Sequence, residues 1–359
     1  MVEKKIVWFD ILTPKQAMLF IALGKRLQEF GLEAIYTTRE HDYIHDIFHH
    51  YGIPFHSFGK YGGKSLEMKL LASAKRVVKL SKFIIALPHQ PALAISLSPP
   101  DATRVAYGLK IPIILFNDTS HSEPVARLTL SLARHLITLS CIDTQKFIAF
   151  GAQPKRIHTY SGVDEIEYIF GENYQHFLEL RNKTSERYLV FRPEESYASY
   201  MINQSTELYL ELLEEILTNY TGQVYVLPRY PQQKEAIKQQ FGPRVFMPKK
   251  GIFFMDLLSK AELVITGGGT MAREAALLGI PSLTYFWRHL EPQVFLEEMG
   301  FPSFSTQTLE DTIRTIRKLC ANPSNYWKDT AKLFTKIQKP GDILLEVLRT
   351  DKKLGKLLS

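Results

Sequence analysis

The sequence predicts an α/β protein in which two Rossmann-like domains, each built on a parallel sheet, follow one another along the chain. The chain has 359 residues, whereas single domains usually have about 100–200. Short apolar segments alternate with amphipathic helical segments, the pattern of doubly wound parallel sheets. This alternation stops over residues 163–185 and then restarts, which indicates a domain junction in that stretch.

The first domain begins with a β-α-β unit. KIVWFDIL is predicted as a buried strand, residues 15–31 as an amphipathic helix ending at Gly31, and LEAIYTT as the next strand. The remaining predicted elements are a helix over 43–51, a short strand before Ser57, a basic helix over 65–82, the strand ALAISL, a helix after Pro100, and the strands IPIILFN, LITLS and RIHTYSG.

The second domain repeats this alternation. Its predicted elements are the strand YLVFR, a helix over 203–219, the strand QVYVLPR, a helix over 232–241, the strand position RVFMP, a helix near 253–260, the strand ELVIT, a helix from about Thr270, the strand SLTYF, and helices after residue 308. We predict domains at 1–165 and 166–335, and a last helix within 336–359 that packs back on the first domain. Ligands of such sheets bind beyond the carboxyl ends of the strands, so a site is expected in an interdomain cleft.

Composition excludes several classes of protein. Hydrophobic residues make up 45% and charged residues 23% of the chain, which is typical of a soluble globular protein. The longest apolar runs are shorter than the ~20 residues of a membrane-spanning helix, and no signal peptide follows the first lysines, so we expect a cytoplasmic protein. Cys141 and Cys320 form no disulfide or zinc pattern. The net charge is +7, and the Lys and Arg residues are scattered along the chain. This distribution favours a solvated surface over peripheral membrane attraction and argues against nucleic acid as a partner.

The most specific local motif is ELVITGGGTMAREAALLGIP. A predicted strand runs directly into Gly267, Gly268 and Gly269, and a helix follows, so backbone N–H groups could contact a diphosphate. Glu274 lies one turn into that helix and could accept hydrogen bonds from two ribose hydroxyls. The alternative is a tight strand-to-helix turn without a ligand. No G-K-[ST] sequence follows, which disfavours ATP hydrolysis.

ITGGGTMAREAALLGIP resembles the nucleotide-binding segment of the GT-B superfamily, especially of UDP-N-acetylglucosamine 2-epimerases. DILTPKQAMLFIALGKRL, IPIILFNDTSHSEPVARLTL, TYSGVDEIEYI and FRPEESYA resemble more closely the prokaryotic family called domain of unknown function 354, over nearly the whole chain. This resemblance implies a GT-B fold and nucleotide-sugar chemistry.

The resemblance also implies roles for individual residues of the second domain. Gly268, Gly269 and Thr270 stand where the superfamily holds the diphosphate, and Glu274 where it holds the ribose. Arg192 matches a phosphate-facing arginine of the epimerases, with a surface ion pair as the alternative. Arg229, after the next strand, is a weaker candidate of the same kind.

Two departures weaken the epimerase interpretation. Epimerases carry a histidine before that arginine, and this chain has Phe191. They also have a G-T-R-P-E loop after the first strand, where this chain has residues 12–16, LTPKQ.

In the first domain, Asp118, Glu123 and Arg127 match the acidic pair and the arginine of the epimerases. Asp118, His121 and Glu123 are therefore candidates for the general base that deprotonates an acceptor hydroxyl. The alternative is an Asx turn at Asn117 and Asp118, followed by Glu123 capping a helix.

Two further residues of the first domain are candidate substrate contacts. Asp10, which ends the first strand, is a candidate for contacting the acceptor, with hydrogen bonds to backbone amides as the alternative. Lys15 is a cation at the start of a predicted helix and a candidate for contacting a phosphate. No metal is expected, because no D-x-D or H-E-x-x-H motif occurs and the regularly spaced His41, His45 and His49 suggest a solvated helix face.

The sequence therefore predicts a metal-independent GT-B-type glycosyltransferase that uses a nucleotide-activated, UDP-linked sugar and no cofactor. A glycan, a lipid-linked molecule and a small molecule stay open as the acceptor, and the sequence gives no oligomeric state. The alternatives are a non-hydrolysing UDP-N-acetylglucosamine 2-epimerase-like enzyme, a sugar-nucleotide hydrolase, and a non-catalytic nucleotide-binding or scaffold protein.

Overall fold

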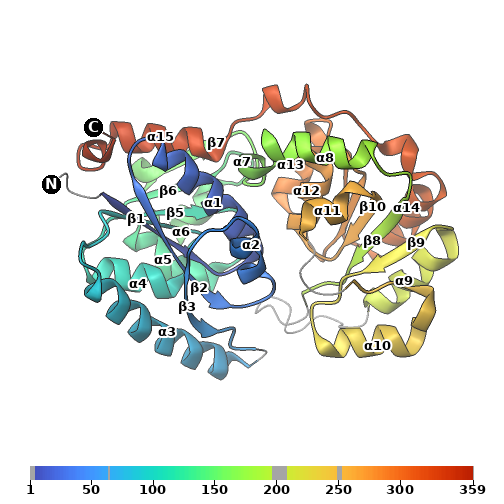
Figure 1. Ribbon diagram of the computed structural model, residues 1–359, viewed down its shortest axis with the longest axis horizontal. Coiled ribbons are helices and arrows are strands. Elements are labelled where there is room, and N and C mark those ends of the chain that lie inside the picture. Colours follow the sequence, from blue (N-terminus) through green and yellow to red (C-terminus); the bar gives the residue numbers. More distant parts are fainter. Residues whose placement is uncertain (1–4, 64, 196–207, 249–252, 359) are drawn as a thin grey trace. The chain divides into compact units, whose positions relative to one another are not determined.

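The chain divides into two compact units in the computed structural model of Figure 1, which describes residues 5–63, 65–195, 208–248 and 253–358. Unit 1 comprises Met1–Glu167 and Gln338–Ser359, and unit 2 comprises Tyr168–Ile337. Each unit contains one parallel sheet with helices around it. The predicted fold class of two Rossmann-like domains in tandem is thereby confirmed.

Unit 1 is built on a sheet of seven strands in the order β3-β2-β1-β4-β5-β6-β7, and every described pair is parallel. The strands are β1 (Ile6–Ile11), β2 (Glu33–Glu40), β3 (His56–Lys60), β4 (Leu93–Ser96), β5 (Ile113–Asn117), β6 (His135–Leu139) and β7 (Ile157–Tyr160). β1 is buried along its whole length and brings Trp8 and Phe9 into the core, as expected for a central strand covered on both faces.

The helices of unit 1 include one segment from the end of the chain. They are α1 (Pro14–Gln28), α2 (Ile44–His50), α3 (Leu66–Ala86), α4 (Pro100–Gly108), α5 (Glu123–Thr129), α6 (Thr144–Ala149) and α15 (Pro340–Thr350), with α7 (Ile166–Ile169) at the division between the units. α15 packs against β6 and β7. Just after α15, the Asp351 carboxylate accepts hydrogen bonds of 2.8 and 2.7 Å from Nε and Nη2 of Arg134, which fixes the C-terminal segment to unit 1.

Unit 2 is built on a sheet of five parallel strands in the order β12-β11-β10-β8-β9. The strands are β8 (Tyr188–Arg192), β9 (Gln223–Val226), β10 (Ala261–Thr266), β11 (Ser282–Tyr285) and β12 (Ser303–Thr306). The helices are α8 (Glu172–Asn182), α9 (Leu208–Asn219), α10 (Pro231–Phe241), α11 (Phe254–Ser259), α12 (Gly269–Leu277), α13 (Glu291–Glu298) and α14 (Leu309–Ala321). Apolar side chains from β8, β10, α9 and α14 share one hydrophobic core.

In both sheets the direction of strand addition reverses once. The reversal lies between β1 and β4 in unit 1 and between β8 and β10 in unit 2. At such a point the connections after neighbouring strands leave toward opposite faces, which opens a crevice beyond the carboxyl ends of the strands. Most of the candidate site residues follow strands close to these two reversals.

Several local predictions differ from the structure. Residues 244–248 form no strand, because only Phe246 pairs there, in a single bridge with Tyr225. The sequence analysis missed β12 and α13, whose short polar segments carry weak periodicity. The start of the helix predicted over 203–219 lies outside the described residues. Among the described parts of the chain, no helix has the length and apolar composition needed to cross a membrane.

Candidate functional site

The glycine loop of unit 2 lies at the reversal point of its sheet. β10 ends at Thr266, Gly267 and Gly268 follow, and α12 begins at Gly269. The N–H of Gly267 donates to the carbonyl oxygen of Arg192, the last residue of β8, at 3.0 Å. A Cβ on Gly267 would lie 2.5 Å from Cα of Glu194, so only glycine allows the β8 and β10 loops to approach this closely.

The two predicted arginines lie beside these glycines. Arg192 is buried and pairs in register with Thr266, directly before the glycine loop. Arg229 donates from Nε to the carbonyl oxygen of Pro193 at 3.1 Å, and its Nη2 lies 3.2 Å from the position that a Cβ on Gly268 would take. The structure therefore brings the predicted phosphate contacts of unit 2 together at one sheet edge, where backbone N–H groups of a helix N-terminus and two guanidinium groups favour an anion.

Glu274 and Thr270 lie on α12 next to this loop. Thr270 is half-buried at the second position of the helix. Glu274 is buried, and its Oε1 accepts a hydrogen bond of 2.8 Å from the hydroxyl of Tyr168. One oxygen of the carboxylate predicted to bind ribose thus already has a donor within unit 2.

Glu194 and Gln293 support the glycine loop and were missed by the sequence analysis. Glu194 is 4% exposed, and its Oε2 accepts a hydrogen bond of 2.9 Å from the hydroxyl of Tyr285. Burial raises the pKa of Glu194. Gln293, on α13, donates to the carbonyl oxygen of Gly269 at 2.7 Å. The FRPEESYA segment was a usable signal for Glu194, since a carboxylate follows there two residues after Arg192, the arginine predicted to face a phosphate, whereas nothing local marked Gln293.

Phe191 belongs to the core of unit 2. Its side chain is fully buried and stacks on Tyr285, with ring centroids 6.2 Å apart. The position where epimerases carry a histidine is therefore occupied here by a packing residue without a proton to transfer.

In unit 1, Lys15 links two carboxylates that follow different strands. Its Nζ lies 2.6 Å from Oδ2 of Asp118, after β5, and 2.6 Å from Oδ2 of Asp164, after β7. The hydroxyl of Tyr160 donates to the other oxygen of Asp164. Burial raises the pKa of Asp164, and the Lys15 ammonium partly opposes that shift. Asp164 is the third member of this network with Lys15 and Asp118, and the sequence analysis missed it although the TYSGVDE segment contains it.

The three candidate bases lie in different surroundings. Glu123 is the first residue of α5, has a 54% exposed side chain, and accepts a hydrogen bond of 2.6 Å from Nε of Arg127. His121 is half-buried in the preceding loop. Oδ1 of Asn117 accepts from the N–H of Thr119 at 2.8 Å, which is the Asx turn weighed as an alternative. Asp118 is thus bound by the buried Lys15, whereas Glu123 forms an exposed pair with Arg127.

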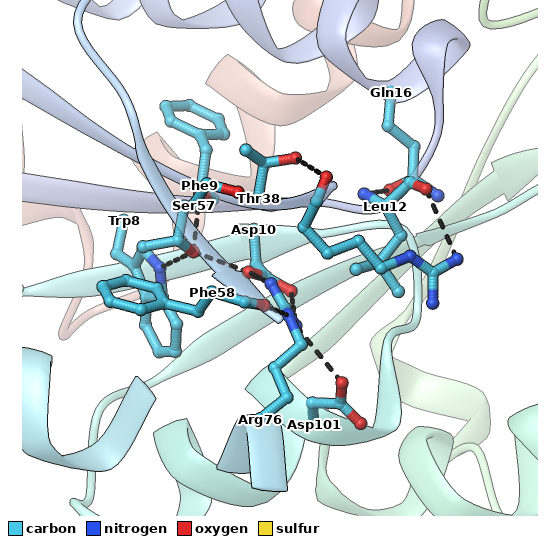
Figure 2. A network of polar contacts seen from close by, with 12 residues as sticks. Trp8, Phe9, Asp10, Leu12, Gln16, Thr38, Ser57, Phe58, Arg76 and Asp101 are labelled. Carbon is cyan, nitrogen blue, oxygen red and sulfur yellow. Dashed lines mark hydrogen bonds and ion pairs between the residues drawn. The ribbon is translucent and has the colours of Figure 1, made fainter. Parts of the chain in front are cut away.

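Asp10 belongs to a second buried ionic network, shown in Figure 2. The side chain is 1% exposed, and its carboxylate accepts from Nη2 and Nη1 of Arg76 at 2.6 and 3.0 Å. Arg76 also donates to Oδ2 of Asp101 at 3.3 Å and, through Nε, to the carbonyl oxygen of Phe58 at 3.1 Å. Both oxygens of Asp10 therefore hold α3 to the sheet, and contact with an acceptor stays a prediction.

The regularly spaced histidines do not share a helical face. His41 precedes α2 and stacks on Tyr61, whereas His45 and His49 lie on α2 against Phe55. Within the described residues, no group of three or more His, Cys, Asp or Glu side chains is arranged to hold a metal.

Two Rossmann-like units, with a glycine loop at the reversal point of the second, define a GT-B fold, and solved structures agree. UDP-GlcNAc 2-epimerase from Methanocaldococcus jannaschii, in complex with UDP-GlcNAc and UDP, matches with a TM-score of 0.70 and 15% identity, over 96% of this chain and all (100%) of the other. UDP-GlcNAc 2-epimerase from Neisseria meningitidis, bound to UDP-GlcNAc, matches with a TM-score of 0.70 and 13% identity, over 96% of this chain and 100% of the other. Spinosyn rhamnosyltransferase SpnG, complexed with spinosyn aglycone, matches with a TM-score of 0.57 and 13% identity, over 96% of this chain and 99% of the other.

The sequence comparison then gives the family. The family described as "Protein of unknown function (DUF354)" matches residues 5–348, and the chain belongs to it. The uncharacterized protein MJ0665 of Methanocaldococcus jannaschii is 27% identical over 292 residues, which cover 79% of this chain and 82% of that protein. The resemblance expected from the sequence is thus confirmed.

Proposed function

We propose that this protein is a metal-independent GT-B-type glycosyltransferase that uses a nucleotide-activated, UDP-linked sugar. The observation that carries this proposal is the glycine loop of unit 2, with Arg192 and Arg229 beside it at the reversal point of the sheet. In glycosyl transfer the diphosphate leaves with negative charge. Backbone N–H groups and guanidinium groups fixed in advance stabilise such charge without rearranging during the reaction. UDP in the solved structures of similar fold supports the choice of nucleotide.

Unit 1 would supply the base for the acceptor. Asp118 is held by Lys15 through Oδ2, and its Oδ1 accepts from the hydroxyl of Thr119 at 2.9 Å. A carboxylate oriented in this way could take the proton of an acceptor hydroxyl as the glycosidic bond forms. Asp118→Asn should therefore lower turnover and leave nucleotide affinity nearly intact.

An enzyme acting on the sugar nucleotide alone is the second candidate. This candidate is favoured because solved structures of similar fold include UDP-GlcNAc 2-epimerases. The buried Phe191 argues against it, because phenylalanine cannot transfer a proton. Incubation with UDP-GlcNAc and no acceptor separates the two, since an epimerase or hydrolase needs no second substrate. A non-catalytic nucleotide-binding protein would bind the nucleotide and turn over neither substrate.

A thermal-shift screen of UDP, GDP, dTDP, CMP and their sugar conjugates tests the donor class. Ligand at about 100 times its dissociation constant adds about 2.7 kcal/mol to the free energy of unfolding. We expect stabilisation by uridine nucleotides, weakened in Glu274→Ala by ~1–3 kcal/mol of binding free energy because two charge-assisted hydrogen bonds are lost.

Tyr168→Phe is the matched control for this screen. It removes the internal hydrogen bond of Glu274 and keeps the carboxylate, so the variant should retain the nucleotide response. Equal affinity in Glu274→Ala and the wild type would remove the ribose assignment. No response to any of the nucleotides would overturn the proposed donor.

A further inference from the structure

Arg39 lies near the end of β2, at the same sheet edge as Lys15 and Asp118, and has an unusual environment for a guanidinium. Its Nη2 donates to the carbonyl oxygen of Leu12, in the connection from β1 to α1, at 3.5 Å, the long limit of a hydrogen bond. Its Cζ lies over the ring of Tyr61, 5.0 Å from the centroid. Arg39 is thus held by an aromatic face and one weak hydrogen bond.

The carboxylates near Arg39 are already bound to another cation. Asp10 and Asp101 both form ion pairs with Arg76, and Arg39 forms none within the described part of the chain. Its Nε is buried and has no hydrogen-bond partner among the described residues. Burial lowers the pKa of Arg39, and the positive charge of Arg76 lowers it further. A desolvated cation with an unsatisfied donor is costly, and native proteins rarely keep one without a reason.

We propose that Arg39 binds a phosphate group of the second substrate, so that the acceptor is a phosphorylated molecule. A guanidinium offers paired N–H donors that match the oxygens of a phosphate. A second cation lies nearby, because Nζ of Lys69 is 5.9 Å from the centroid of the same Tyr61 ring. The ring of His41 also stacks on Tyr61, with centroids 4.6 Å apart, and its N–H is a further hydrogen-bond donor there.

The position fits a substrate of the same site. Leu12 directly precedes the N-terminal turn of α1, which carries Lys15, and the positive end of this 15-residue helix favours an anion there. The assignment of the phosphate to the acceptor rests on the proposed function. The binding of phosphate at Arg39 is independent of the proposed function.

Isothermal titration with inorganic phosphate, at constant ionic strength, tests the site in the full-length protein. We compare the wild type with Arg39→Gln and with Arg104→Gln, which removes the same charge from an exposed position on α4 of the same unit. Arg39→Gln should raise the dissociation constant for phosphate about tenfold or more, because charge-assisted hydrogen bonds are lost, and Arg104→Gln should leave it unchanged. Equal dissociation constants in all three proteins overturn the inference.

Phosphate could also bind at the glycine loop of unit 2, so Arg192→Gln is titrated in parallel. If only Arg192→Gln loses phosphate affinity, the Arg39 site is refuted while the proposed donor site stands. If phosphate binding depends on Arg39 and no nucleotide binds, the proposed function fails and this site remains. Acetate binding as strong as phosphate binding would overturn the choice of phosphate. Arg39→Lys keeps the charge without the paired donors, and an intermediate affinity is expected even if Arg39→Gln fails to fold.

Discussion

The carboxyl edges of the two sheets differ in the chemical groups that they present. In unit 2 the edge is centred on glycines, helix N–H groups and two arginines, of which Arg229 pairs with Glu195 at 3.5 Å, and only glycine fits at Gly267. In unit 1 the edge consists of charged side chains that bind one another, namely Lys15 with Asp118 and Asp164, and Arg76 with Asp10 and Asp101.

The difference suggests a division of labour. Backbone groups cannot change rotamer or ionisation, which suits a fixed contact to a diphosphate whose charge does not vary with the substrate. Carboxylates and ammonium groups can exchange protons and partners, which suits the deprotonation of an acceptor. The buried networks of unit 1 also fix distant elements, because Arg76 joins α3 to β1 and α4.

The largest expected effect is on the charged network of unit 1. Arg76→Met leaves Asp10 and Asp101 buried without their common cation, and breaking a buried pair from one side typically costs ~3–5 kcal/mol of unfolding free energy. Urea denaturation of this variant measures the loss, with Arg104→Met as the exposed control on the same unit. A loss below about 1 kcal/mol, the scale of an exposed ion pair, would show that the nearby Arg39 takes over the two carboxylates.

The sequence was a good guide to the fold and to the position of the glycine loop in unit 2, for a common physical reason. Alternating apolar strands and helices are local patterns, and the glycine loop is contiguous in the chain, so its position directly after β10 follows from the sequence alone. Short polar segments such as β12 carry too little periodicity to be recognised.

The site of unit 1 was harder to predict, because its partners come from distant segments. Lys15 binds Asp118 and Asp164, which lie 103 and 149 residues further along the chain. No local sequence pattern predicts such distant pairs. Asp118 and Glu123 are close in sequence, yet Asp118 is bound by Lys15 and Glu123 by Arg127 at the exposed start of α5, a difference that closeness in sequence does not indicate.

A smaller effect is expected from the backbone site of unit 2. Gly267→Ala places a methyl group 2.5 Å from Cα of Glu194, so the β8 loop must shift, at a cost of ~1–3 kcal/mol of unfolding free energy. Nucleotide affinity should fall as well, because the shift moves Arg192 relative to the loop. Denaturation and nucleotide titration measure both effects.

Gly268→Ala is the matched control for this substitution. Its added Cβ meets only Nη2 of Arg229, at 3.2 Å, the far end of a flexible side chain. Its stability should therefore stay closer to the wild type than that of Gly267→Ala. Equal losses in the two variants would mean that the close approach of the β8 and β10 loops is not what requires glycine.

The smallest expected effect concerns Glu123, the acidic candidate base of unit 1 that lies outside the buried networks. Its exposed i,i+4 pair with Arg127 should contribute only ~0.3–0.5 kcal/mol to the free energy of unfolding, so Glu123→Gln should be almost as stable as the wild type. Turnover with donor and acceptor then separates two roles. If Glu123 is a base, Glu123→Gln lowers turnover without loss of stability or nucleotide affinity, as Asp118→Asn should. Unchanged turnover in Glu123→Gln beside a loss in Asp118→Asn would place the base in the Lys15 network, where Nζ of Lys15 and the hydroxyl of Thr119 orient the Asp118 carboxylate.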